Sequence, residues 1–147
     1  MTVTNDCPFC GVEAALESAA PRETAHLTPH WRLTAHRSAL PGWMLLIPRR
    51  HVRSIGELDD AAAAELGPLL RAAARVHAAE FAAEKTYVMQ FAEGVSHAHF
   101  SLVPRRADLP ADRRGPAVSA YNAEDEPLGE VERDALALRI RTAWVAE

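Results

Sequence analysis

Two histidines and a serine stand at alternating positions within a short apolar stretch: His97, His99 and Ser101. Side chains two residues apart in a β-strand point to the same face, so these three polar groups would share one face while the residues between them pack on the other. A neutral imidazole can attack phosphorus directly and form a covalent phosphoramidate that water later opens. The stretch therefore predicts a polar site on a packed sheet, with His99 as the candidate nucleophile.

Hydroxyl and guanidinium groups near His99 have the chemistry to hold a phosphate. Ser101 and Ser96 can donate hydrogen bonds to phosphate oxygens, and Arg105 would add positive charge if its side chain turned inward. A lone histidine on a strand is more often structural, so the hypothesis depends on these neighbours. The other histidines receive no role, and four arginines are interpreted as solvated: Arg49, Arg50, Arg113 and Arg114.

Both cysteines lie in one CPFC unit at residues 7–10. This spacing lets the thiolates of Cys7 and Cys10 reach one ion, and His51 and His97 would complete the N2S2 set typical of structural zinc. A metal-free pair with two surface histidines is the alternative. A second alternative is a dithiol redox site, because the unit resembles the glutaredoxin motif. Only six residues precede Cys7, however, which leaves no room for the strand that would hold that motif on a thioredoxin fold.

The elements that must position these residues follow from hydrophobic patterning. A strand at residues 31–35 and a continuous apolar run at 43–47, joined by a Pro-Gly turn, predict a hairpin whose second strand is buried on both faces. The other predicted elements are a short helix at 12–18, a weak strand at 23–28, a long helix from Asp59 or Asp60 to Glu84 that Gly67-Pro68 should kink or divide, strands at 86–92 and 97–103, a surface segment at 105–126, and a helix at 129–146 that buries Val131, Leu136, Ile140 and Trp144. This order predicts a mixed α+β fold with an antiparallel sheet.

Length and charge limit the classes of function. The 147 residues fit one domain, and the net charge of −4 provides no basic field that would favour a nucleic acid polymer. The apolar runs are too short to span a membrane, and the N-terminus lacks the charged-then-apolar order of a signal peptide. We therefore expect a cytoplasmic protein with neither a membrane nor a nucleic acid polymer as partner.

These motifs resemble those of the histidine triad (HIT) superfamily. The family hallmark His-φ-His-φ-His-φ-φ, often followed by Pro-Arg, corresponds to HAHFSLVPR at residues 97–105. The upstream family stretch Pro-Gly-His-x-Leu-φ-Ile-Pro-Lys-x-His corresponds to PGWMLLIPRRH at 41–51, and the Cys-x-Phe-Cys of many bacterial members to residues 7–10. The three matches keep the family order and cover residues 7–106. The tail from Ala107 onward resembles, less firmly, an actinobacterial-type subgroup.

The resemblance implies a single HIT-like domain over residues 1–147, with a five-stranded antiparallel sheet, a long helix and a C-terminal helix. It implies a homodimer with a continuous ten-stranded sheet. It also implies a hydrolase or nucleotidyltransferase that acts at the α-phosphate of a nucleoside phosphate, phosphoramidate or dinucleoside polyphosphate, with His99 as nucleophile. Zinc-bearing relatives imply Cys7, Cys10, His51 and His97 as ligands of a structural zinc ion. Phe9 and Leu33 are expected to sandwich the base.

Three positions depart from the family pattern. Ser101 replaces the third histidine, where the uridylyltransferase branch of the family has glutamine. Ala35 falls where members usually offer Asp or Asn to the ribose hydroxyls, and the loop at residues 93–96 is shorter than the usual glycine-rich phosphate loop. The alternative function is therefore a nucleotide-binding or interaction protein that kept the sheet but lost turnover.

Overall fold

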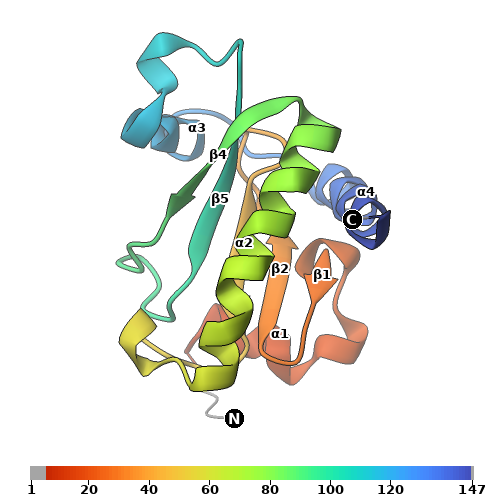
Figure 1. The fold of residues 1–147 in the computed structure, drawn as a ribbon, viewed down its shortest axis with the longest axis vertical. Helices are drawn as coiled ribbons and strands as arrows, with labels where there is room; N and C mark the ends of the chain where they lie inside the picture. Colours follow the sequence, from red (N-terminus) through yellow and green to blue (C-terminus); the bar gives the residue numbers. More distant parts are fainter. Residues whose placement is uncertain (1–5, 147) are drawn as a thin grey trace.

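The computed structural model describes residues 6–146 and contains a five-stranded antiparallel sheet in the order β1-β2-β3-β5-β4 (Figure 1). The adjacent strands β2 and β3 form the predicted hairpin, with Leu33 opposite Leu46. The α+β antiparallel fold class is confirmed. The strands are β1 (His26–Leu27), β2 (Trp31–Ala35), β3 (Met44–Pro48), β4 (Ala83–Met89) and β5 (Phe100–Arg106).

Helices lie on both faces of the sheet. The long helix α2 (Asp60–Phe81) and the C-terminal helix α4 (Glu130–Ala146) cover one face, and α1 (Pro8–Ala14) and α3 (Ala120–Ala123) lie toward the other (Figure 1). Asp59 caps α2 by accepting a hydrogen bond from the Ala62 N–H at 2.8 Å. Five short 3-10 turns complete the described chain: Leu16–Ser18, Pro21–Glu23, Ile55–Glu57, Ala111–Arg113 and Gly115–Ser119.

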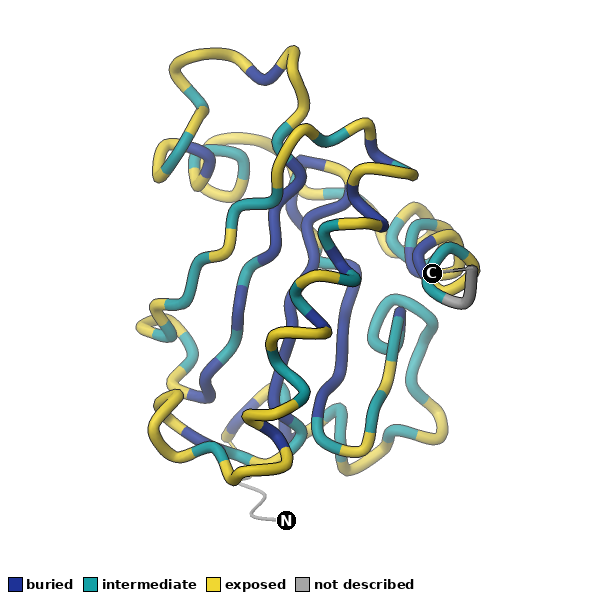
Figure 2. Tube along the Cα trace, in the orientation of Figure 1, coloured by how far each residue is buried: buried dark blue, intermediate teal, exposed yellow. Residues whose placement is uncertain are grey.

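The sheet separates two hydrophobic cores. Every residue of β3 is buried, as the continuous apolar run predicted, and every residue of β2 is buried as well (Figure 2). Alternation sends Met44 and Leu46 to the core under α2 and α4, whereas Leu45 and Ile47 join the core on the opposite face. The face of Leu45 is also the face of Ser101, because these two residues are paired across β3 and β5.

Several predicted boundaries differ from the structure. In place of the predicted helix at 12–18, α1 spans Pro8–Ala14 and a 3-10 turn spans Leu16–Ser18, and β1 is shorter than the strand predicted at 23–28. Helix α2 ends at Phe81 because Ala82 adopts a left-handed backbone with φ of 52°, so β4 begins earlier than predicted. Pro68 lies inside α2 without dividing it. Strand β5 begins only at Phe100, because the backbone N–H of Ala98 donates to the carbonyl of Val52 at 2.8 Å instead of to a neighbouring strand.

The predicted buried stripe of α4 is correct only after the first helical turn. Ile140 is fully buried, and Leu136 and Trp144 pack against the core, but Val131 is 84% exposed and was wrongly predicted. At the start of the helix Glu130 Oε1 lies 3.5 Å from Arg22 Nη2, and Arg133 Nε donates to the carbonyl of Ala35. Val131 lies between these two residues in the chain but on the side of the helix that faces solvent.

The segment after β5 is more tightly packed than predicted. Leu109 and Val118 are buried in the core on the His99 side of the sheet. The backbone N–H of Gly115 donates to the hydroxyl of Tyr87 on β4 at 3.0 Å. This surface segment thus lies against the sheet instead of extending into solvent.

A buried histidine joins α2 to the turn before β3. His77 Nε2 donates to the carbonyl of Gly42 at 2.7 Å, and its Nδ1 accepts from the Thr86 hydroxyl at 2.8 Å. Gly42 has φ of 92°, and a side chain there would meet the Phe81 ring at 2.8 Å, so the turn requires glycine. Burial lowers the pKa of His77 to about 4.

We expect His77 to make folding stability depend on pH. The unfolded chain takes up a proton near pH 6.5, whereas the folded protein does so only near pH 4. The contribution of His77 to the free energy of unfolding is therefore fully present above pH 6.5. It falls by on the order of 3 kcal/mol as the pH decreases from 6.5 to 4. Urea unfolding of the wild type and of His77→Gln at pH 7, 6 and 5 gives the free energy of unfolding at each pH. We expect this free energy to depend less steeply on pH in the variant, and an equal pH dependence would contradict the prediction.

Candidate functional site

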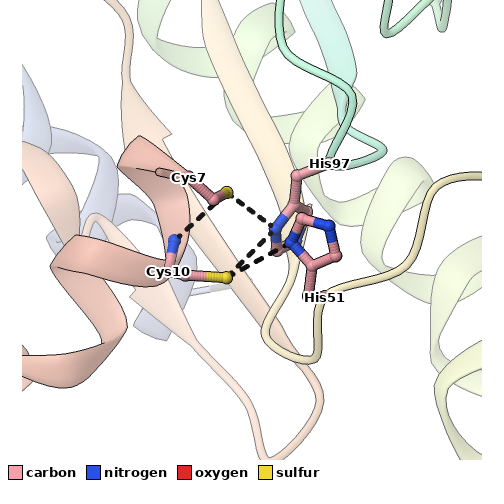
Figure 3. Close-up of side chains that lie close together, drawn as sticks. All are labelled: Cys7, Cys10, His51 and His97. Carbon is pink, nitrogen blue, oxygen red and sulfur yellow. Dashed lines mark hydrogen bonds between the residues drawn. The ribbon is translucent and has the colours of Figure 1, made fainter. Parts of the chain in front are cut away.

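Two thiols and two imidazoles meet at one end of the sheet (Figure 3). The ligand atoms of Cys7, Cys10, His51 and His97 all lie within 4.8 Å of one another. Cys7 Sγ lies 3.3 Å and Cys10 Sγ 3.7 Å from His97 Nδ1, and Cys10 Sγ lies 3.3 Å from His51 Nδ1. The structure therefore brings together the four residues that the sequence singled out as a ligand set.

Local structure explains how the two cysteines come to face the histidines. Cys7 is the N-cap of α1, with Pro8 in the first helical turn, and its sulfur accepts from the Cys10 N–H at 3.5 Å. The two thiols therefore lie on the same side of the first turn. His51 follows the end of β3 and His97 precedes β5, and β3 and β5 are adjacent in the sheet.

Hydrogen bonding fixes which nitrogen of His97 faces the thiols. The carbonyl of Pro48 can only accept, so His97 Nε2 at 2.7 Å must donate. In the neutral ring Nδ1 then presents its lone pair to the two sulfurs. Desolvation by burial lowers the pKa of His97, which favours this neutral ring.

The ligand set fits a tetrahedral metal ion. Zinc bond lengths of about 2.3 Å to sulfur and 2.0–2.1 Å to nitrogen place S and N about 3.5 Å apart in a tetrahedral site, close to the separations of 3.3 and 3.7 Å seen here. Burial raises the pKa of the Cys7 thiol. A redox-active cysteine has a lowered pKa, so the raised pKa of Cys7 argues against a redox nucleophile.

Buried ion pairs fix α1 to the sheet. Arg32 on β2 is fully buried, and its Nε lies 3.3 Å from Glu13 Oε1 on α1. Arg49 Nε, just after β3, donates to Glu13 Oε2 at 3.2 Å. Arg49 is therefore not the solvated side chain expected from the sequence. Arg32 Nη1 also donates to Glu23 at 3.1 Å, so the carboxylates on both sides hold it in place.

His99 is oriented by its own backbone. Its Nδ1 donates to the carbonyl of His97 at 2.8 Å, which leaves the lone pair of the neutral ring on Nε2. The Phe9 ring packs edge-on against it at 5.1 Å. His99 and Ser101 together line a cavity of about 210 Å³, and His99 is not one of the four clustered ligands. The imidazole thus stands at a cavity with a free nitrogen.

The structure separates Ser96 and Arg105 from this cavity. Ser96 lines a neighbouring cavity of about 390 Å³ beside Cys7 and His51. Arg105 Nη1 instead donates to Glu84 Oε2 at 2.6 Å. It lies six residues along the chain from His99, about 20 Å at strand spacing. The position of Arg105 therefore argues against the expected phosphate contact.

The two predicted nucleoside contacts have different surroundings. Phe9 touches His99 and packs against the core on the same face of the sheet. Leu33 is 1% exposed in the core under α2, on the opposite face from Ser101. Its position argues against the expected contact with a base. Ala35, where the family pattern has a polar residue, belongs to the same buried core under α2.

Several residues of the cavity were not predicted from the sequence. Trp43 from the turn before β3 lines it, as do Ser119 and Asn122 from the segment after β5. Tertiary packing alone brings this segment to the sheet, so no motif spacing in the sequence could have identified Ser119 and Asn122 as cavity residues. His36 was also given no role; burial, helped by Arg133, lowers its pKa to about 4, so it is neutral at pH 7.

Solved structures share this fold. Neither a protein-family model nor a curated protein matches the sequence. The HIT-like protein involved in cell-cycle regulation from Bartonella henselae superposes with a TM-score of 0.72 at 19% identity, over 97% of this chain and 99% of that chain. A Zn-bound histidine triad family protein from Mycobacterium smegmatis gives 0.69 at 19% identity, over 96% and 94%. A hypothetical histidine triad nucleotide-binding protein from Sulfolobus tokodaii gives 0.72 at 16%, over 95% and 93%.

These likenesses show that the chain has the histidine triad fold, as its motifs implied. The described residues include no helix with the length and apolarity needed to cross a membrane.

Proposed function

We propose that this protein is a HIT-type nucleotide hydrolase or nucleotidyltransferase that acts at the α-phosphate of a nucleoside phosphate, phosphoramidate or dinucleoside polyphosphate. The observation that carries the proposal is the orientation of His99: its Nδ1 is held by the His97 carbonyl, and Nε2 is the free nucleophilic nitrogen beside a cavity. The histidine triad fold of the solved neighbours supports it, since one of them is described as nucleotide-binding.

The reaction would proceed by two displacements at phosphorus. His99 Nε2 attacks the α-phosphorus and forms a P–N bond as the bond to the leaving group breaks, and the leaving group takes a proton from solvent. Water or another acceptor then attacks the same phosphorus, gives up its proton and releases the imidazole. Ser101 donates a hydrogen bond to a phosphate oxygen, because its hydroxyl lines the cavity of His99. Phe9 supplies an apolar surface for the base.

Cys7, Cys10, His51 and His97 would hold a structural zinc ion. Their N2S2 chemistry, their spacing and the fixed tautomer of His97 support this assignment. The ion would cross-link α1 to the end of β3 and the start of β5, two residues from His99. The paired free thiols suit a reducing compartment such as the cytoplasm.

The covalent intermediate gives the direct test. The protein is mixed with adenosine 5′-phosphoramidate or a diadenosine polyphosphate, quenched within milliseconds to seconds, digested and analysed by mass spectrometry. We expect the mass of an adenylyl group on the peptide that contains His99. Turnover without any adduct on this peptide would reject the mechanism.

The alternative function, nucleotide binding without turnover, has specific support. Ser101 stands where the family pattern has a histidine, and the surroundings of Leu33 and Arg105 argue against two of the expected substrate contacts. Nucleotide affinity with no adduct and no turnover in the same experiment would favour this alternative. The resemblance of residues 107–147 to an actinobacterial-type subgroup stays a prediction in either case.

The free edge of β4 supports a homodimer. β4 is the last strand of the sheet, whereas the opposite edge strand β1 has only two residues. Val88 on β4 is 47% exposed and Phe91 beyond it 74% exposed. Pairing of β4 edges from two copies would bury both and extend the sheet to ten strands. We expect Phe91→Asp to shift the protein from dimer to monomer in light scattering; a monomeric wild type would contradict the proposal.

A further inference from the structure

The segment from Gly115 to Ala123 forms one wall of the His99 cavity. Ser119 and Asn122 line that cavity together with His99 and Ser101 from the other side. Because His99 lies just before β5, Ser101 lies on it and the segment lies across from both, a ligand held by His99 would contact this wall. None of the substrate contacts expected from the sequence lies in this segment.

This wall is held firmly against the sheet. Val118 is completely buried in the core on that face, and the backbone N–H of Gly115 is bonded to the Tyr87 hydroxyl. Arg113 stacks over the Tyr121 ring at 4.4 Å and pairs with Asp125. These contacts set the position of the cavity wall before any ligand arrives, which is the condition for a specific binding site.

The polar groups of the wall have no partners of their own. Within residues 6–146, the side chains of Ser119 and Asn122 make no hydrogen bond. Trp43, which lines the same cavity, is 3% exposed, and its Nε1 has no hydrogen-bond partner in the described chain. A buried indole N–H is normally paired, and Ser119 and Asn122 are exposed at the same cavity. These groups together point to a ligand with oxygen acceptors and hydroxyl donors.

The position on β2 that would be expected to recognise the sugar cannot do so here. Ala35 at the end of β2 has no polar side chain, and it is buried in the core under α2, away from the cavity. An amide can both donate to and accept from neighbouring hydroxyl groups, which is what the 2′ and 3′ hydroxyls of a ribose need.

We propose that Asn122, assisted by Ser119, binds the ribose hydroxyls of the nucleotide and so determines the sugar specificity of the site. This inference rests on the proposed nucleotide function. It assigns sugar recognition to the segment after β5, in place of the strand β2.

Calorimetric titration tests the inference without requiring turnover. AMP, GMP, CMP and UMP are titrated first, and the best ligand is then compared with its 2′,3′-dideoxy form. We expect the wild type to prefer the ribose form by about tenfold. Asn122→Ala should lose this preference by weakening the ribose form alone, whereas Asn122→Asp, which keeps an acceptor, should retain part of it. Glu126→Gln, an exposed change three residues beyond this segment, is the control and should retain all of it.

The possible results separate the two proposals. If Asn122→Ala keeps the wild-type ratio between the ribose and dideoxy forms, the inference is overturned, and adduct formation on His99 still decides the proposed function by itself. If the wild type binds ribose and dideoxy forms equally, the inference is likewise overturned. If the wild type binds none of the four nucleotides, the inference is overturned, and adduct formation on His99 again decides the proposed function by itself.

Discussion

Replacing His99 with glutamine is expected to abolish the nucleotidyl-enzyme and to lower turnover by roughly 10⁴-fold or more. The glutamine amide can still donate to the carbonyl of His97, as Nδ1 of the histidine does at 2.8 Å. It offers no lone pair nucleophilic enough to attack phosphorus. Among the described residues that line the cavity there is no second imidazole; the others are two serines, an asparagine, a carboxylate, an indole and apolar groups. Quenched-flow kinetics with mass detection of the adduct measures both effects.

Ser101→Ala provides the graded comparison. It leaves the nucleophile in place and removes one hydroxyl from the cavity, so we expect a loss of about 10- to 100-fold in kcat/KM with the adduct still forming. The contrast between the two variants distinguishes a nucleophile from a phosphate contact. His99→Gln retaining wild-type turnover would exclude attack by His99, whatever the effect at Ser101.

The parts of the fold that the sequence predicted are those fixed by local pattern. The apolar run at residues 43–47 could only be a buried strand, and β3 is buried throughout. Boundaries failed where one tertiary contact overrides the pattern. The bond from Ala98 to the Val52 carbonyl delays β5. The first turn of α4 is held to the protein through Glu130 and Arg133, which leaves Val131 on the solvent side.

The residues of the site also separate into those that a motif predicts and those that only tertiary packing places there. The ligand cluster could be predicted because each of its four residues belongs to a motif with its own spacing, and the structure brings them within 4.8 Å. Glu13 and Arg32 follow no motif, and their pairing depends on where α1 meets β2. Ser119 and Asn122 lie in a segment whose composition indicates only a surface loop. Their position at the cavity depends on burial of Val118 and on the Gly115–Tyr87 hydrogen bond.

Removal of the proposed zinc ion should cause the largest loss of stability. We expect the purified wild type to contain about one zinc ion per chain, and Cys7→Ser to contain almost none. Serine is a favoured N-cap residue, so this change keeps the cap of α1 while removing a metal ligand. Any loss of stability therefore reports the ion and not the helix end. We expect at least about 3 kcal/mol, or roughly 10 °C in Tm for a domain of this size.

A chelator supplies the matched control. Incubation of the wild type with a zinc chelator should lower its Tm to that of Cys7→Ser, while the Tm of the variant should not change, because it has no ion left to lose. The loss should stay well below that of a zinc finger, which unfolds without metal, because the cores on both faces of the sheet persist. If the purified wild type contains no metal and the chelator does not alter its Tm, the zinc assignment is contradicted and the two thiols are a metal-free pair. Reduction of a mixed disulfide by that protein, lost in Cys7→Ser, would then favour the redox alternative.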